Sequence, residues 1–253
     1  MDKMKKFSTL ILVVILFVSC NNDDDNTPIN VDVLFNFTQN WDGTNVSRAD
    51  FGVTDYTTDF GHEINILRIR YLISRMVLRN SNGDTFNVGD YNLIDMDDSS
   101  TFSFDPNVTV PEGTYTLSFV YGFNQADNID GAYLDLNTAS WSWPAALGGG
   151  YHFMQFDGMY DVNEVVPSPF NFHNGTAKVS DGVFEQNFVE FLLTNNLVIE
   201  EGSTIEIKMN IAEWFKNPYS WDLDVYNTTL MPNYDAQKLM QQNAATVFSA
   251  VIN

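Results

Sequence analysis

The stretch TIEIKMNI, residues 204–211, alternates strictly between polar and apolar side chains. Ile205, Ile207, Met209 and Ile211 occupy every second position. Successive side chains of an extended chain point to opposite faces, so this spacing gives one apolar face and one polar face. The stretch therefore predicts a β-strand with one side buried and the other in water.

The same alternation recurs in VDVLFNF (31–37) and TYTLSFVY (114–121). A longer run, EINILRIRYLISRMVL (63–78), loses its phase near Leu72, which predicts a β-bulge or a strand break there. Turn pairs such as Asn82-Gly83 separate the apolar segments. Short strands and polar turns indicate an antiparallel sandwich or barrel. We expect an all-β fold, a Greek-key-like antiparallel β-sandwich.

One helix is predicted near the C-terminus, packed on the sandwich. Asp235 is a suitable N-cap, and apolar residues follow at helical spacing. This stripe consists of Ala236, Leu239, Met240, Ala244, Val247, Phe248 and Val251.

The first residues have the composition of an export signal. Lysines at positions 3, 5 and 6 precede an apolar run over residues 7–18, which is too short to span a bilayer. The run ends at FVSC, where Cys20 is the single cysteine of the chain. A lipoprotein signal over residues 1–19 is the preferred interpretation, with Cys20 acylated as the mature N-terminus. An ordinary signal peptide with an incidental cysteine is the alternative.

An acidic segment, NNDDDN (21–26), follows the cysteine. Its composition predicts a solvated, disordered tether over residues 20–30, with one folded domain over 31–253. The segment resembles the acidic export signal of surface lipoproteins in the Bacteroidetes, although a plain polar spacer has the same composition. We expect an outer membrane lipoprotein, either periplasmic or surface-exposed.

The charge of the chain limits its partners. The chain has twelve basic residues and 33 acidic ones, which gives a formal net charge of −21. This balance argues against nucleic acid and against anionic lipid headgroups, so contact with a membrane is expected only through the lipid anchor. With no second cysteine, the mature fold has no intrachain disulfide.

No catalytic motif is present. The sequence lacks G-x-S-x-G, H-E-x-x-H and a glycine-rich phosphate loop. Acidic residues are too abundant for any pair to indicate a glycosidase. We therefore expect a protein that is not an enzyme, with no catalytic residues, and a hydrolase is the least favoured class.

Three histidines are the candidate metal ligands: His62, His152 and His173. Each could be structural, either exposed to water or bonded to a local turn. Two imidazoles brought together would make a site for copper or zinc, with copper preferred at the same nitrogen ligands.

Two tryptophans lie close to one of these histidines, in SWSWPAALGGGYHFMQFDG (140–158). Trp141 and Trp143 share one face of an extended segment, and rings of this size usually cover a core. Gly148, Gly149 and Gly150 allow the chain to reverse tightly.

This segment, followed by FNFHNG (170–175), resembles the signature of the MbnP-like copper-binding family. The shared pattern is W-x-W, then G-Y-x-F-x-x-x-x-G, then F-x-H with a glycine soon after. Other similar stretches occur in the family's order, so the resemblance covers the chain from about Val31 onward. They are LRIRYLISRMVLRNSNGD (67–84), YNLIDMD (91–97), VPEGTYTLSFVYGFN (110–124) and EWFKNPYSWDL (213–223).

The resemblance implies a secreted β-sandwich that binds copper through histidine. His173 matches the motif histidine, and Trp143 and Trp141 match W-x-W. In some family members a tryptophan is oxidised to kynurenine by a partner, a di-haem protein of the MbnH type. His152 occupies a variable position of the motif, and His62 has no assigned counterpart.

Two functional hypotheses remain open at this point. The first is a metal-binding lipoprotein that serves copper acquisition or handling. The second is a surface module that binds a protein or glycan through exposed aromatics such as Trp41, Trp214 or Trp221, with purely structural histidines.

Overall fold

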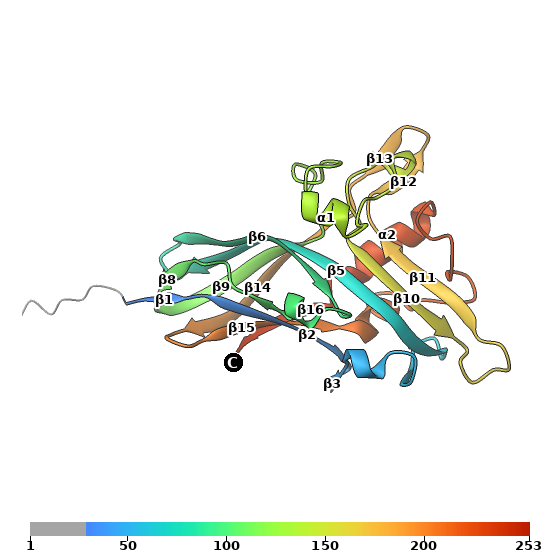
Figure 1. Cartoon of the computed structure of the whole chain (residues 1–253), viewed down its shortest axis with the longest axis horizontal. Helices are drawn as coiled ribbons and strands as arrows, with labels where there is room; N and C mark the ends of the chain where they lie inside the picture. The colour runs from blue at the N-terminus through green and yellow to red at the C-terminus, as the bar shows by residue number, and fades with distance from the viewer. Residues whose placement is uncertain (1–28) are drawn as a thin grey trace, which may run out of the picture.

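The computed structural model describes residues 29–253, and Figure 1 shows the strands that dominate it. The predicted signal sequence, Cys20 and most of the predicted tether lie outside the described residues, so those predictions stay untested. Within the described part of the chain, no helix is long and apolar enough to cross a membrane.

The larger sheet is organised around one long strand, β5 (Glu63–Asn80). The first half of β5 pairs with β4 and β10, and its second half pairs with β6 and β9. The other strands of this sheet are β4 (Asp55–Thr57), β6 (Thr85–Asp95), β9 (Gly113–Tyr121), β10 (Met154–Tyr160), β11 (Ser168–Asn174) and β14 (Val189–Ile199). All of its pairs are antiparallel.

The smaller sheet has the order β16-β15-β2-β3, with β7 beside β2. Its strands are β2 (Leu34–Trp41), β3 (Thr44–Asn45), β7 (Ser103–Phe104), β15 (Thr204–Asn210) and β16 (Phe248–Ile252). The β15–β2 pair is parallel, unlike the antiparallel pairing that we expected throughout. Two short ribbons lie outside both sheets: β1 (Asn30–Asp32) with β8 (Thr109–Pro111), and β12 (Ala177–Ser180) with β13 (Val183–Glu185).

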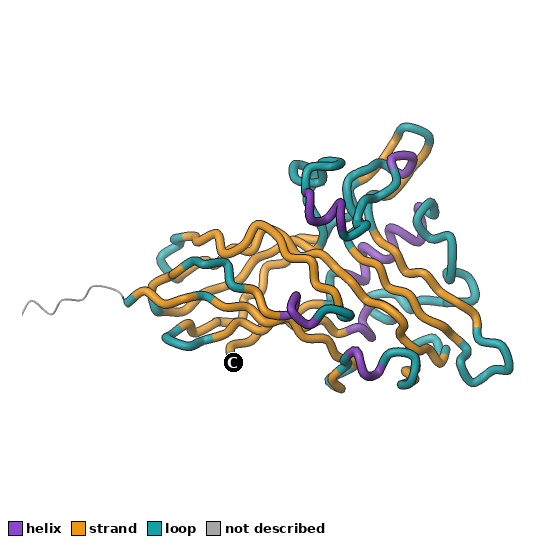
Figure 2. The backbone as a smooth tube through the Cα atoms, in the orientation of Figure 1, coloured by secondary structure: helices purple, strands orange, loops and turns teal. Residues whose placement is uncertain are grey.

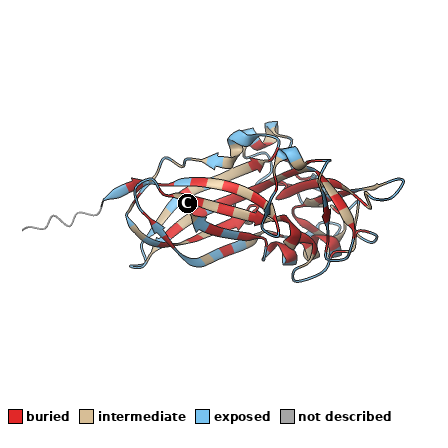
Figure 3. Cartoon of the chain, turned by 90° about the horizontal axis from the view of Figure 1, so that it is seen from below, coloured by how far each residue is buried: buried red, intermediate tan, exposed pale blue. Residues whose placement is uncertain are grey.

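The two sheets pack face to face through aromatic side chains. The ring of Phe248 in the smaller sheet lies 5.7–5.9 Å from the rings of Tyr71, Phe119 and Tyr121 in the larger one. Gln39 crosses the same interface, donating a hydrogen bond to the Tyr71 hydroxyl. Buried residues run along the strands between the sheets, and exposed residues concentrate in the loops (Figures 2 and 3). A mostly β fold with antiparallel sheets is confirmed.

The phase slip in β5 corresponds to a bulge at Arg75. Pairing with β9 shifts register between Ser74 and Val77, and pairing with β6 shifts between Met76 and Val77. Arg75 adopts a left-handed conformation with φ of 51°. Residues 71–74 are all buried, because neighbouring strands and packed layers cover both faces of β5 at this point. The predicted bulge is thus present, three residues beyond Leu72.

The C-terminal helix is shorter than predicted. α2 spans Tyr234–Ala244, and its N-cap is Asn233, whose side chain accepts a hydrogen bond from the backbone N–H of Ala236. The prediction that Asp235 caps the helix and that it continues to Val251 is wrong. Residues 248–252 alternate in burial and pair with β15 as β16, so the apolar stripe spans a helix and a strand. A second short helix, α1 (Leu134–Thr138), precedes the tryptophan segment.

Candidate metal site

The tryptophan segment folds back on the residues that follow it. The backbone N–H of Trp143 donates to the carbonyl of Gly150, and that of His152 donates to the carbonyl of Trp141. Ser142 and Tyr151 form an antiparallel bridge between these bonds. Opposed residues of an antiparallel pair point to the same face, so Trp141, Trp143 and His152 share one side.

Two glycines make this arrangement possible. Gly148 has a φ of 113°, which permits the reversal between the two arms of the segment. Gly175, which directly follows β11 (Ser168–Asn174), lies against the indole of Trp143. A Cβ atom at position 175 would be 2.6 Å from two atoms of that ring, so only glycine fits.

His152 and His173 lie next to each other beside the tryptophans. Their ring centroids are 5.4 Å apart with the planes nearly perpendicular. Two imidazoles that share one ion at metal–nitrogen distances of about 2.0–2.1 Å have centroids roughly 5–6 Å apart. The His152 ring also lies 4.9 Å from Trp143 and 5.5 Å from Trp141. This spacing suits two nitrogen ligands on one ion.

His152 is held as a neutral imidazole. Only 6% of the residue is exposed, and its Nδ1 atom is buried without a hydrogen-bond partner. Burial, together with the positive charges of His173, Arg70 and Arg68, lowers the pKa of His152 to about 3. A histidine must be neutral to bind a metal, so the unpaired Nδ1 lone pair fits a metal ligand.

Asp157 orients the second imidazole. Its Oδ1 atom lies 2.9 Å from Nε2 of His173, and it also accepts hydrogen bonds from Asn171 and Arg68. Burial would raise the pKa of Asp157, but its hydrogen bonds with His173 and Asn171 and the charge of Arg68 hold it at about 2. An ionised Asp157 accepts the Nε2 proton, which leaves the ligand lone pair on Nδ1 of His173.

Helix α2 fixes the backbone of the same histidine. The buried Gln237 side chain donates to the carbonyl of His173 at 2.7 Å and accepts from the backbone N–H of Gly175 at 3.2 Å. It also accepts from the amide of Asn174. In Figure 1, α2 lies beside β11, the strand that carries His173. Gln237 therefore links the helix to the site.

A cleft of about 580 Å³ opens onto His173 and Asp157. Its walls are mostly apolar, and they come from the tryptophan segment and from the loop before α2. The apolar residues lining it are Pro144, Leu147, Leu230, Met231 and Pro232. The cleft gives a metal ion a route to the more exposed imidazole.

The third predicted ligand, His62, belongs to a different group. Its Nδ1 atom lies 3.0 Å from Asp161 and its Nε2 atom 3.4 Å from Asp222. His173 is opposite Gln155 in β10, whereas Asp161 directly follows β10. At about 3.3 Å per residue, the six steps from Gln155 to Asp161 span roughly 20 Å. The structure thus brings together two of the three predicted ligands, and places the third elsewhere.

His62 and two carboxylates form a group that could hold a metal ion. His62, Asp161 and Asp224 each offer one ligand atom, all within 4.8 Å of one another. Burial disfavours the imidazolium, but hydrogen bonds to Asp161 and Asp222 raise the pKa of His62 above its usual value.

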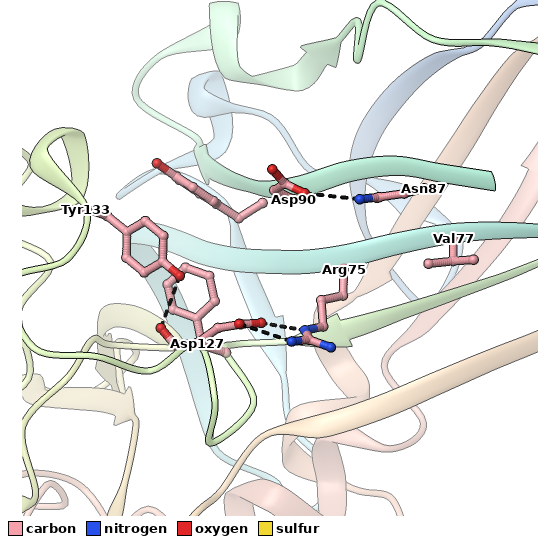
Figure 4. A pocket seen from close by; sticks show the side chains of 8 residues that line it. Arg75, Val77, Asn87, Asp90, Asp127 and Tyr133 are labelled. Carbon is pink, nitrogen blue, oxygen red and sulfur yellow. Dashed lines mark hydrogen bonds and ion pairs between the residues drawn. The ribbon is translucent and has the colours of Figure 1, made fainter. Parts of the chain in front are cut away.

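A separate cleft of about 490 Å³ lies at the bulge of β5. Figure 4 shows the Arg75–Asp127 ion pair at its edge, with Tyr133 close by. The other carboxylate, Asp90, accepts a hydrogen bond from Asn87. One carboxylate of this cleft is thus paired with Arg75, and the other is bonded to an amide.

Comparison with known proteins identifies the chain. The MbnP family model matches residues 30–233. The chain belongs to the MbnP family. Its structure is similar to that of MbnP from Methylosinus trichosporium, with a TM-score of 0.53, 13% sequence identity, and coverage of 88% of this chain and 99% of that chain. At this identity the likeness shows a shared fold. A search of curated protein sequences finds no significant match.

Local sequence does not predict several residues of the two groups. Asp157 lies in an alternating strand of the tryptophan segment, but its pairing with His173 depends on register between β10 and β11. Asp161 and Asp224 are two of many acidic residues, and no local spacing marks them. Only the fold shows which carboxylates approach a histidine.

Proposed function

We propose that this member of the MbnP family is an extracytoplasmic lipoprotein that binds copper through His152 and His173. Cys20 would carry the lipid, and the protein would serve metal acquisition or handling at the outer membrane, without catalysing a reaction. Copper is cargo in this account.

One observation carries the proposal: the buried, unpaired Nδ1 of His152 lies in a ring that packs against His173. Leaving a buried polar atom without a partner costs about 1–3 kcal/mol, so the arrangement needs a compensating role. A metal ion supplies one, because it binds the lone pair that no hydrogen-bond donor reaches. Imidazole ligands suit copper and zinc, and copper binds more tightly to a given nitrogen site.

The tryptophans would shield the bound ion. Trp141 and Trp143 are 0% and 1% exposed, and both rings contact His152. An apolar wall controls solvent access and tunes the properties of a metal site. The proposal includes an MbnH-like di-haem partner that would oxidise one of these rings, Trp143 in preference, as in some family members. Intact mass spectrometry of the protein isolated from its native host tests this part.

Copper titration in competition with a chelator tests the proposal. Purified wild-type protein is compared with His173→Ala and His152→Ala, and His62→Ala serves as the matched control. We expect tight binding of one ion at the pair in wild type and in His62→Ala, with at least a hundredfold weaker binding in the other two variants. Equal affinity in all four proteins would overturn the assignment.

The alternative function, a surface module that binds a protein or glycan, required exposed tryptophan side chains as its binding surface. Trp41, Trp214 and Trp221 are 9%, 0% and 0% exposed, so the prediction that they are exposed is wrong. These rings pack in the core, where Trp41 contacts Phe215 and Trp221 contacts Phe172.

A further inference from the structure

Three distant parts of the chain converge on His62. The histidine precedes β5, Asp161 follows β10, and Asp222 and Asp224 lie in the loop between residues 216 and 233. Asp222 also accepts a hydrogen bond from the backbone N–H of Asp224, which fixes the second carboxylate beside the first. This convergence depends on the tertiary fold, since the three segments are far apart in sequence.

The spacing of the group suits a shared ion. Nδ1 of His62 lies 3.0 Å from Asp161, and His62, Asp161 and Asp224 offer ligand atoms within 4.8 Å of one another. The opposite ring nitrogen, Nε2, lies 3.4 Å from Asp222. Neighbouring ligand atoms in a tetrahedral site with metal–ligand distances of about 2.0–2.1 Å are roughly 3.3 Å apart. One ring nitrogen can therefore ligate an ion while the other donates its proton to the remaining carboxylate, an arrangement common for metal-bound histidine.

The charge of the group is not balanced by the protein. Among the described residues, Asp161 and Asp222 form ion pairs only with His62, and Asp224 forms none. Three carboxylates thus surround one imidazole, which carries at most a single positive charge. A divalent cation would compensate more of this negative charge than a proton does.

The histidine is enclosed by more than its acidic neighbours. His62 is only 8% exposed, with Phe60 stacked on its ring at 5.5 Å and Tyr160 edge-on at 5.5 Å. Such a buried imidazole has a fixed orientation toward the carboxylates. Asp224 is exposed, so an ion has access from solvent.

We propose that His62, Asp161 and Asp224, supported by Asp222, form a second cation site, separate from the His152–His173 pair. One nitrogen and two or more carboxylate oxygens suit a divalent ion of intermediate hardness such as Zn²⁺. The site is independent of the proposed copper function, because it shares no ligand with that pair. A bound ion would also fix the loop at residues 161–167, which Asp161 opens.

Zinc titration of the double variant His152→Ala/His173→Ala tests this site, since the other pair of histidines is absent. In that background, Asp224→Asn and His62→Ala are compared with Glu201→Gln, which removes one negative charge from an exposed turn elsewhere. We expect one Zn²⁺ per chain in the parent, at least tenfold weaker binding in the first two variants, and unchanged binding in the control. Asp224→Asn keeps the buried core intact, so its result is informative even if His62→Ala unfolds.

A second measurement identifies the ligand chemistry. Ca²⁺ prefers oxygen ligands alone, so it should not displace Zn²⁺ at comparable concentration if His62 ligates. Absence of zinc binding, binding unchanged in Asp224→Asn, or equal binding of Ca²⁺ would each overturn the proposal. Failure of the copper titration leaves these outcomes unaffected, because the zinc experiment uses a protein without His152 and His173.

Discussion

Gly175 follows the motif histidine by two residues and lies beneath Trp143. The close approach of the indole explains the glycine sterically, since its φ is not left-handed. The role of this glycine is thus to let a tryptophan reach the histidine pair.

Replacing Gly175 with alanine should destabilise the protein by about 1–3 kcal/mol, the usual cost of overpacking a filled core. Because the indole must move, copper affinity should fall as well. Chemical denaturation and copper titration measure the two effects. Gly113→Ala is the control, because a Cβ there meets its nearest neighbour at 3.7 Å and needs no rearrangement. Equal stability of the two variants would show that Trp143 does not depend on the glycine.

His152 makes the metal-free protein sensitive to acid. Its pKa is about 3 in the folded state, against 6.5 when unperturbed. Between these values the unfolded chain binds a proton that the folded chain does not, so stability falls as pH falls. We expect this residue alone to lower the free energy of unfolding by roughly 2 kcal/mol between pH 7.5 and pH 5.

Urea denaturation at the two pH values, in wild type and in His152→Gln, isolates this contribution. The loss of stability on acidification should be smaller in the variant by roughly that amount. If both proteins lost the same free energy of unfolding, His152 would take up a proton in the folded state as readily as in the unfolded chain. A protonated His152 could not bind a metal ion.

At the scale of elements, α2 supports the site through Gln237. This side chain is fully buried and serves both the carbonyl of His173 and the N–H of Gly175. Gln237→Leu would leave these buried groups without partners, at a cost of about 2–4 kcal/mol. Copper affinity should fall in parallel, and Gln242→Ala, on the exposed face of α2, should change neither. Thermal melts measure the stability of both variants, and copper titration measures their affinity. Retained copper affinity in Gln237→Leu would show that β11 holds His173 without the helix.

The elements also show what local sequence can predict. The alternation at residues 204–211 becomes β15 with Ile205, Ile207 and Met209 buried, as the two-residue period requires. The stripe from Ala236 to Val251 predicts one long helix, because a helix and a strand in succession can present apolar residues at spacings that fit such a helix. Tertiary pairing with β15, which no local pattern encodes, decides between them.

At the scale of the whole molecule, the sequence identified the class of fold and the family, but not the partners of the histidines. His173 was found through its motif, whereas the contact between His152 and His173 depends on how the tryptophan segment folds onto β11. The separation of His62 from this pair depends on the length of β10. Both facts are tertiary, so residue spacing could not supply them.

We expect one copper ion to bind between His152 and His173. Crystals of the copper-loaded protein, with diffraction data collected above and below the copper absorption edge, locate the ion directly. The account predicts the strongest anomalous difference peak between these two imidazoles, beside Trp143. A strongest peak at His62 and Asp161, or none within bonding distance of His173, would contradict it.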